Sequence, residues 1–221
     1  MQLYNLDASP YAARVRLLLR ARGAQIDLVP PPGKDEFRAI TPLGKVPALK
    51  LDDGSILPES DIICGYLDAV LPGPSLWPQD PAARARIALV VRLADLYLSP
   101  GLSDFFTILF TNPGDRDALA ALAPGIARGL KYLDHYVAPG PHAVPGGFSQ
   151  ADCALAPMLF YVDGMLAAMT GGSLLEKRPA LLAYWQAIRQ DPIAAPVLAE
   201  MQAALKKYDR MLQAAGQAAQ Q

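Results

Sequence analysis

The run of residues 41–63 constrains the fold more than any other part of the chain. It reads as a loop ending in Val46-Pro47, two short apolar strands with an Asp-Asp-Gly turn between them, and a helix that begins near Ser60. Asp and Gly tolerate the backbone angles that tight hairpin turns need, so residues 52–54 predict a hairpin. We therefore expect an antiparallel hairpin that leads directly into a helix.

The same run carries groups that could hold an extended, peptide-like ligand. Val46-Pro47 presents backbone polar groups just before the first strand, and Glu59-Ser60 places a carboxylate and a hydroxyl where the helix begins. Loop backbone can pair with ligand backbone, and a helix N-terminus attracts a carboxylate. Taken alone, Glu59-Ser60 fits an ordinary helix cap better than a binding site.

The residues before and after this run give the chain two different halves. Residues 2–6 and 26–29 read as strands, Ser9-Pro10 is a favourable helix start, and residues 35–40 suggest a short helix. Residues 71–79 contain three prolines and a glycine, which indicates a linker. We therefore expect an α/β domain over residues 1–74 and an all-helical domain over residues 75–221.

The second half is predicted to be helical throughout, with interruptions at prolines. Pro100-Gly101 should bend or break one helix, and Pro124-Gly125 should interrupt a segment near residues 115–137. Ser149 to Asp152 resembles a capping box with Asp in place of Glu, followed by a very apolar helix over residues 155–169. Residues 179–189 and 192–212 predict two further helices, and residues 214–221 should fray.

Composition excludes several classes of function. The chain has 221 residues, 52% of them hydrophobic, and a formal net charge of −1, so it can bury a core and carries no excess charge for nucleic acid or an anionic membrane. The N-terminus lacks the features of a signal peptide, and no run is long enough for a membrane span, which favours a cytoplasmic protein. Cys64 and Cys153 suggest buried thiols, and His135 and His142 lie far apart, so no metal site is predicted.

Four arginines recur along the first predicted helix. They form a basic run in which neighbouring arginines are two to four positions apart. We interpret them as a solvated basic face that could form salt bridges to a partner subunit. The residues concerned are Arg14, Arg16, Arg20 and Arg22.

Five motifs in order give the chain a family resemblance. They are Ser9-Pro10, the run Pro-Leu-Gly-Lys-Val-Pro-Ala-Leu at 42–49, Glu59-Ser60, Asp80-Pro81, and Ser-Gln-Ala-Asp-Cys-Ala-Leu-Ala-Pro at 149–157. In this order and spacing the chain resembles the glutathione transferase family over nearly its whole length, and most closely its bacterial members with a Ser-Pro pair. The resemblance implies a thioredoxin-like N-terminal domain, an all-helical C-terminal domain, a homodimer and a role in detoxification. It assigns no subclass.

The resemblance also implies how glutathione binds. Pro47 would be cis, which exposes the backbone of Val46 to the ligand. Glu59 would pair with the ammonium of the γ-glutamyl group, while the Ser60 hydroxyl and the helix amides take its carboxylate. Lys45 would reach the glycine carboxylate.

For the thiol, the resemblance points to Ser9. Its hydroxyl would donate to the glutathione sulfur, although Ser9 could also serve simply as a helix cap. Tyr4 is the rival, because some classes use a tyrosine from the first strand, but its alternation favours strand packing. The absence of cysteine near Ser9 disfavours members that form mixed disulfides.

A second-substrate pocket is expected between the domains. Tyr11 lies in the first helical turn near the expected sulfur, and Phe105 and Phe106 belong to an apolar stretch after the Pro100-Gly101 bend. These three residues are candidate pocket walls, and core packing is the competing interpretation. The pocket would accept a small hydrophobic electrophile.

The predicted function is therefore a glutathione transferase, with glutathione as co-substrate and no other cofactor. One alternative is a non-catalytic ligand-binding or assembly module with the same fold. Another is a glutathione-dependent isomerase or peroxidase. Isomerases of this family carry more serines and a cysteine at the first helix, unlike Ala8-Ser9-Pro10-Tyr11 here.

Overall fold

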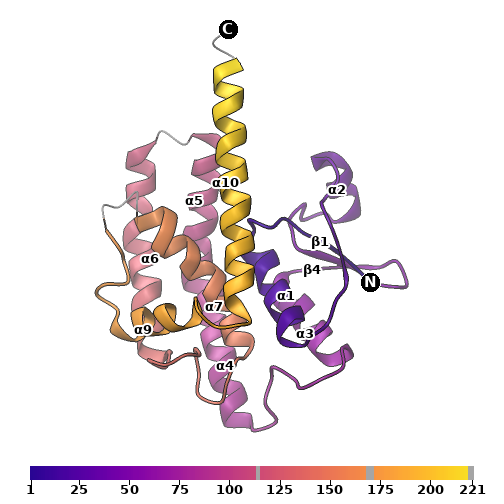
Figure 1. Cartoon of the computed structure of the whole chain (residues 1–221), viewed down its shortest axis with the longest axis vertical. Coiled ribbons are helices and arrows are strands. Elements are labelled where there is room, and N and C mark those ends of the chain that lie inside the picture. Colours follow the sequence, from indigo (N-terminus) through magenta and orange to yellow (C-terminus); the bar gives the residue numbers. More distant parts are fainter. Residues whose placement is uncertain (113–114, 168–171, 219–221) are drawn as a thin grey trace. The chain divides into compact units, whose positions relative to one another are not determined.

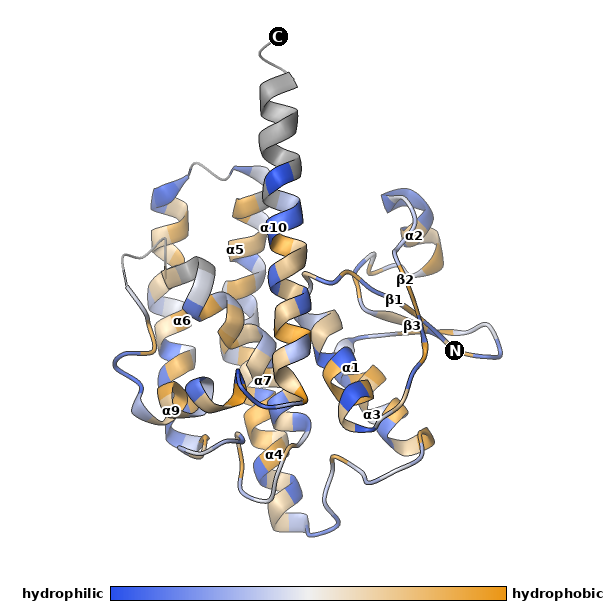
Figure 2. Ribbon diagram, in the orientation of Figure 1, coloured by the Kyte–Doolittle hydropathy of each residue, from blue (hydrophilic) through white to orange (hydrophobic). Residues whose placement is uncertain are grey.

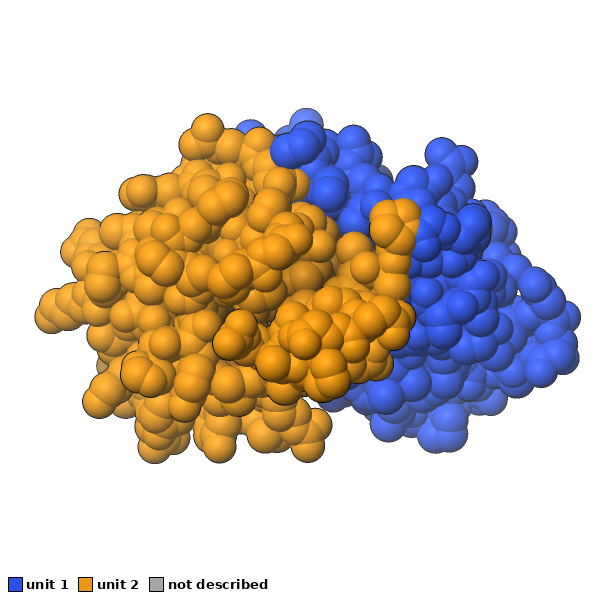
Figure 3. All heavy atoms as spheres, turned by 90° about the horizontal axis from the view of Figure 1, so that it is seen from below, with its two compact units in different colours: residues 1–73, 192–221 blue, residues 74–191 orange. Residues whose placement is uncertain are grey.

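The chain folds into two compact units. The computed structural model describes residues 1–112, 115–167 and 172–218. One unit comprises Met1–Gly73 with Pro192–Gln221, and the other comprises Pro74–Asp191; Figure 3 colours them separately. The division between Gly73 and Pro74 falls beside the predicted boundary.

The C-terminal helix belongs to a different unit from the one that the sequence predicts. Residues 192–221 were expected in a helical domain over residues 75–221, but they group with the first unit. The reason is that α10 (Ala194–Ala218) packs on α1 (Pro10–Ala21). The order of elements along the chain does not show that the last helix packs on the first one.

The first unit contains a sheet of four short strands (Figure 1). The strands are β1 (Gln2–Tyr4), β2 (Asp27–Val29), β3 (Ala48–Lys50) and β4 (Ile56–Pro58), in the order β2-β1-β3-β4. β1 runs parallel to β2 and antiparallel to β3, which pairs antiparallel with β4. With α1, α2 (Lys34–Ile40) and α3 (Ser60–Val70), this confirms the predicted βαβ–α–ββα order.

The turn of the β3–β4 hairpin forms as its sequence predicts. The Ser55 backbone N–H and hydroxyl both donate to Oδ1 of Asp53, at 2.9 and 2.6 Å. These bonds lower the pKa of Asp53, with the hydroxyl contributing most. Gly54 has a φ of 86°, a left-handed conformation that glycine adopts at little cost.

The core of the first unit lies between the sheet and the pair α1 and α3, which pack on each other. In Figure 2 both helices carry hydrophobic and hydrophilic residues along their length. Five apolar side chains from the strands and the two helices are fully buried here: Leu3, Leu17, Leu49, Ile63 and Leu67.

The prediction of a solvated arginine face on α1 is wrong. Arg14, Arg16 and Arg22 are only 1%, 5% and 8% exposed, and of the four arginines Arg20 alone is exposed. Both α3 and α10 pack against α1, which leaves little of its surface open. Each buried guanidinium faces a carboxylate, in the pairs Arg14–Asp61 (3.9 Å), Arg16–Asp7 (2.9 Å) and Arg22–Asp68 (3.3 Å).

The second unit consists of helices. They are α4 (Pro81–Leu93), η1 (Ala94–Leu98), α5 (Ser99–Thr111), α6 (Arg116–Tyr136), α7 (Gln150–Tyr161), η2 (Val162–Leu166) and α9 (Pro179–Ile188). As predicted for the apolar helix, α7 is buried along almost its entire length. It continues as the π-helix η2, and the predicted end at 168–169 lies outside the described residues.

The two proline-glycine pairs do not interrupt the helices as expected. Before Pro100 the helix changes to the π-helix η1, in which the Ser99 N–H donates to the carbonyl of Ala94, and α5 follows without a loop. α6 runs continuously through Pro124, which is exposed. A proline inside a helix costs roughly 3 kcal/mol. Burial of the opposite face of α6, including Leu119, Ile126, Leu130 and Leu133, offsets that cost.

The predicted capping box at the start of α7 is confirmed. Oδ2 of Asp152 accepts from the backbone N–H and the hydroxyl of Ser149, at 2.8 and 3.0 Å, and Oδ1 accepts from the Ala143 N–H at 2.7 Å. Burial nevertheless raises the pKa of Asp152. This carboxyl group therefore ties the preceding loop to α7.

The last helix, α10, extends to the last residue that the structure describes. α10 reaches Ala218, so residues 214–218 are helical where fraying was expected, and residues 219–221 lie outside the described part. Among the residues described, no helix combines the length and apolar character needed to span a membrane.

Candidate functional site

The sheet register brings the predicted binding residues to one edge. Tyr4, the last residue of β1, pairs with Ala48, the first of β3, which pairs with Pro58, the last of β4. The loop before Ser9, the Val46-Pro47 turn and the start of α3 therefore all adjoin this edge. Two helix N-termini, those of α1 and α3, follow the strand ends here, and their partial positive charges favour bound anions.

Ser9 is the N-cap residue of α1. Its Oγ accepts from the backbone N–H of Ala12 at 3.2 Å, and Pro10 occupies the first helical position, as expected. A hydroxyl has one proton to donate in addition to its acceptor lone pairs. The cap therefore uses the acceptor capacity of Ser9 and leaves its proton for another partner.

The turn before β3 has the predicted geometry. The Val46-Pro47 peptide bond is cis, Val46 is half-buried and Lys45 is exposed. Gly44 has a φ of 57°, and a Cβ at this position would lie 2.8 Å from Cγ of Arg38. Arg38 therefore lies close to this turn, which the sequence did not predict because Arg38 and Gly44 are not neighbours along the chain.

Glu59 and Ser60 lie at the start of α3. Ser60 is the first helical residue and is buried. Glu59 is exposed, has a φ of 70° and makes no side-chain capping bond to the helix. The simple capping interpretation therefore does not hold for the side chain of Glu59, although the residue occupies the N-cap position.

The tyrosines near Ser9 differ in their surroundings. Tyr4 packs edge-to-face on Phe37 of α2, with ring centroids 5.2 Å apart, as expected for strand packing. Tyr11 is half-buried in the first turn of α1. Its position keeps part of its side chain accessible on the same helix turn as Ser9.

Phe105 and Phe106 lie in the second unit. Phe105 is 0% exposed, so it offers no surface to a ligand in this conformation and fits the core interpretation. Phe106 is half-buried and packs edge-to-face on Tyr161, with centroids 4.7 Å apart. Of the two residues, only Phe106 presents accessible surface.

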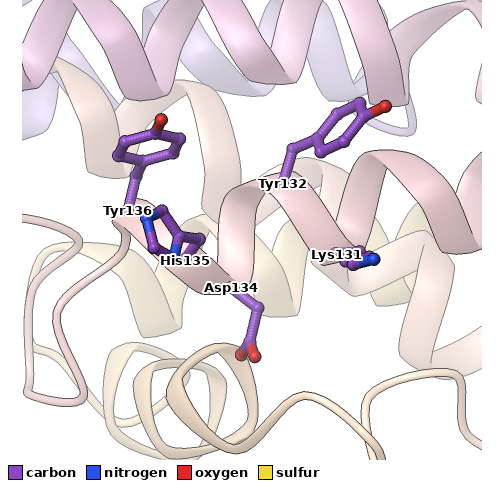
Figure 4. Close-up of a pocket in the computed structure, with 5 residues that line it drawn as sticks. All are labelled: Lys131, Tyr132, Asp134, His135 and Tyr136. Atoms are coloured by element: carbon purple, nitrogen blue, oxygen red, sulfur yellow. The ribbon is translucent and has the colours of Figure 1, made fainter.

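A separate surface hollow of about 490 Å³ lies along α6 in the second unit (Figure 4). Lys131, Tyr132, Asp134, His135 and Tyr136 line it. It contains none of the predicted site residues. Within the described residues, no group of three His, Cys, Asp or Glu side chains could hold a metal ion.

Comparison with family models matches both halves of the chain. Residues 3–75 match the model described as glutathione S-transferase, N-terminal domain. Residues 116–187 match the model of the corresponding C-terminal domain.

Individual proteins show the same similarity. The chain is 29% identical to glutathione S-transferase 2 of Saccharomyces cerevisiae over 212 residues, which is 87% of each protein. It is 30% identical to probable maleylacetoacetate isomerase 1 of Drosophila melanogaster over 169 residues, 71% of this chain and 67% of the relative. The crystal structure of a glutathione S-transferase from Methylobacillus flagellatus with bound glutathione superposes with a TM-score of 0.74 and 26% identity, covering 89% of this chain and 98% of the other.

Proposed function

Because the chain belongs to the glutathione S-transferase family, we propose that it activates the thiol of glutathione for attack on a small, apolar electrophile. Glutathione is then a co-substrate, and no further cofactor is required. The observation that carries the proposal is the position of the Ser9 hydroxyl. It stands at the N-terminus of α1, at the same sheet edge as Val46-Pro47 and Glu59-Ser60.

The chemistry requires a thiolate. A free thiol with a pKa of about 8.5 is only a few per cent ionised at pH 7. Lowering that pKa by about 2 units means stabilising the thiolate by about 2.7 kcal/mol. The Ser9 proton can supply a hydrogen bond to the sulfur, and the N-terminus of α1 adds a favourable dipole.

The thiolate is the nucleophile of the proposed reaction. Its sulfur attacks the electrophilic carbon and forms a C–S bond with its own electron pair. In a substitution the leaving group departs with the pair that bound it, and in an addition the neighbouring carbon receives the displaced pair and then a proton. Tyr11 is the candidate contact for the electrophile on the first unit, and the roles predicted for Phe105 and Phe106 stay predictions.

The rest of glutathione has complementary groups at the same edge. The Glu59 carboxylate can pair with the γ-glutamyl ammonium, and the Ser60 hydroxyl with the first amides of α3 can receive the carboxylate. The Val46 backbone can pair with the ligand backbone, and Lys45 can approach the glycine carboxylate.

Isomerisation is a second candidate, favoured by the similarity to the Drosophila isomerase. A thiolate that adds reversibly to a double bond permits rotation about it, so the same activated thiol would serve. The segment Ala8-Ser9-Pro10-Tyr11 lacks the additional serines and cysteine expected of such enzymes. Parallel assays with 1-chloro-2,4-dinitrobenzene, a hydroperoxide and maleylacetoacetate would separate conjugation, peroxidase activity and isomerisation.

A homodimer is also part of the proposal. In the second unit, Tyr97, Tyr132 and Tyr136 are 46%, 38% and 50% exposed, and the first two rings pack edge-to-face. Exposed aromatic surface of this kind favours association with a partner. Light scattering on the purified chain should give twice the monomer mass.

We also propose a cytoplasmic location, which accords with the free thiols of Cys64 and Cys153.

The test of the main proposal is the ultraviolet absorbance of the thiolate of bound glutathione, measured across pH. We expect a lowered thiol pKa in the wild type and a value restored toward about 8.5 in Ser9→Ala. Bound glutathione with an unshifted thiol pKa in the wild type would instead support the non-catalytic binding module. A shifted pKa that survives Ser9→Ala would assign thiol activation to another group.

A further inference from the structure

Arg16 is a buried side chain of α1 whose guanidinium reaches two separate segments of the first unit. Nη1 donates to Oδ1 of Asn5 at 3.2 Å and to Oδ1 of Asp7 at 2.9 Å, and Nη2 donates to the backbone oxygen of Asp7 at 2.8 Å. On the other side, Nε lies 3.4 Å from Oε2 of Glu200 on α10. A guanidinium offers its donors in a fixed planar fork, so these contacts hold the segment around Asp7 in one position against α1.

The segment that Arg16 holds is the loop that delivers Ser9 to α1. It comprises only residues 5–8, between the end of β1 and the cap. Nδ2 of Asn5 donates to Oδ1 of Asp7 at 2.8 Å, and the Ser9 N–H donates to the Leu6 carbonyl at 2.9 Å. Because one residue separates Asp7 from Ser9, a shift of Asp7 must be transmitted to the Ser9 hydroxyl.

We propose that Arg16 is a positioning residue for the Ser9 hydroxyl, and that α10 helps to orient Arg16 through Glu200. The inference rests on the proposed role of Ser9 as hydrogen-bond donor to the glutathione sulfur. Arg16 acts through the loop, by way of Asp7. Hydrogen bonds weaken steeply with distance and misalignment, so a displaced hydroxyl stabilises the thiolate less.

Arg22 provides a matched control on the same helix. It is also buried, its Nη1 donates to Oδ1 of Asp68 at 3.3 Å, and its Nη2 donates to the Asp68 carbonyl at 3.2 Å and to the carbonyl of Leu71. These contacts are at the C-terminal end of α1, remote from the cap. Replacing either arginine by lysine keeps the charge and removes the planar fork, so both variants should lose stability.

The experiment measures the thiol pKa of glutathione bound to the full chain, together with the melting temperature. We expect Arg16→Lys to raise the thiol pKa by about one unit, which is about a tenfold lower thiolate-to-thiol ratio at any fixed pH. Arg22→Lys should lower the melting temperature without moving that pKa. If both variants lose stability and neither changes the thiol pKa, Arg16 is merely structural and the inference is overturned.

Asp7→Ala keeps the inference testable if Arg16→Lys does not fold. The Asp7 side chain is 61% exposed, so its removal should be tolerated. Removing a nearby negative charge would by itself favour the thiolate and lower the thiol pKa. A rise in the thiol pKa of Asp7→Ala therefore supports lost positioning, whereas an unchanged or lower value contradicts it.

Ser9→Ala, measured beside these variants, separates the two proposals. If Ser9→Ala leaves the thiol pKa unchanged, the role of Ser9 fails and the inference about Arg16 fails with it. If Ser9→Ala raises the pKa but Arg16→Lys and Asp7→Ala do not, only the role of Arg16 is refuted. Glu200→Gln tests the contribution of α10, and we expect a smaller rise of the same sign; no rise would remove α10 from the proposal.

Discussion

At the scale of single residues, Glu59 combines an unfavourable backbone with a candidate binding role. Its φ of 70° and ψ of 116° are disfavoured for any residue with a Cβ, at a cost of order 1–3 kcal/mol. The Glu59 side chain does not offset this cost, because it makes no capping hydrogen bond to α3. Strain of this kind clusters at ligand-binding positions, which accords with the proposed contact to the glutathione ammonium.

Substitution of Glu59 should separate strain from binding. We expect Glu59→Gly to stabilise the fold by about 1 kcal/mol, because glycine accepts this φ, while Glu59→Ala keeps the strain. Both variants should bind glutathione at least about tenfold more weakly, since a charge-assisted hydrogen bond is lost. Urea denaturation and titration calorimetry measure the two effects. Unchanged affinity in both variants would remove Glu59 from the site.

Ser9 has two roles that different substitutions can divide. Ser9→Ala should cost about 1 kcal/mol of stability through the lost N-cap, whereas glycine at the same position should cost only a few tenths. Both variants lack the hydroxyl, so both should lose turnover to a similar extent. Glutathione-conjugation rates and urea denaturation provide the comparison. If Ser9→Gly kept wild-type turnover, Ser9 would be a cap and no more.

At the scale of helices, a close contact between α6 and η1 lies near the two proline sites where the sequence predicted breaks. A Cβ on Gly129 of α6 would lie 2.2 Å from the carbonyl oxygen of Tyr97, within the π-helix η1. α6 therefore approaches the backbone of η1 at the point where the hydrogen-bonding pattern widens. The two segments in contact, η1 with α5 and α6, are the ones that continue past Pro100 and Pro124 without a loop.

Two glycines of α6 make a matched test of this contact. Gly129→Ala should destabilise the chain by about 3 kcal/mol or more, because the methyl group meets backbone that cannot rotate away. Gly125→Ala, on the same helix with nothing within 4 Å of its added Cβ, should stabilise by about 0.5–1 kcal/mol. Denaturant midpoints measure both changes. Equal effects of the same sign would show that α6 and η1 are not in close contact.

At the scale of the whole molecule, buried charge links stability to pH. Burial raises the pKa of Asp152 above the value of about 4 expected for the unfolded chain. A raised carboxyl pKa favours folding while the group is protonated. Its contribution is therefore fully present below about pH 4 and is lost as pH rises through the folded-state pKa.

Comparison with Asp152→Asn isolates this term, because asparagine does not titrate. The free energy of unfolding of the wild type minus that of the variant should fall as pH rises above about 4 and through the folded-state pKa of Asp152. Urea titrations at several pH values give the difference. A difference that increases with pH would mean that the three hydrogen bonds accepted by Asp152 outweigh its burial.

Much of this protein could be predicted from local sequence. The turn at residues 52–54, the cap at Ser9 and the capping box at Ser149 each depend on a few neighbouring residues, and all three are present. The cis bond before Pro47 came from the family motif, since the base rate for such bonds is low. The roles of Lys45, Val46, Glu59 and Ser60 remain predictions, although the sheet register places their segments at one edge.

What local sequence could not show depends on contacts between distant residues. Arg14 and Arg22 of α1 looked like surface residues because their carboxylate partners Asp61 and Asp68 lie more than 45 positions away. Phe105 could have been a pocket wall or a core residue, and only its packing distinguishes the two.

The sequence by itself determined the order of strands and helices, the turn at residues 52–54 and the caps at Ser9 and Ser149, because these are fixed by residues within a few positions of one another. Tertiary structure decided that α10 joins the first unit, that α6 remains helical through Pro124, and that Arg16 braces the loop before Ser9. In each case the deciding free energy comes from burial and hydrogen bonding between segments that are remote in the chain.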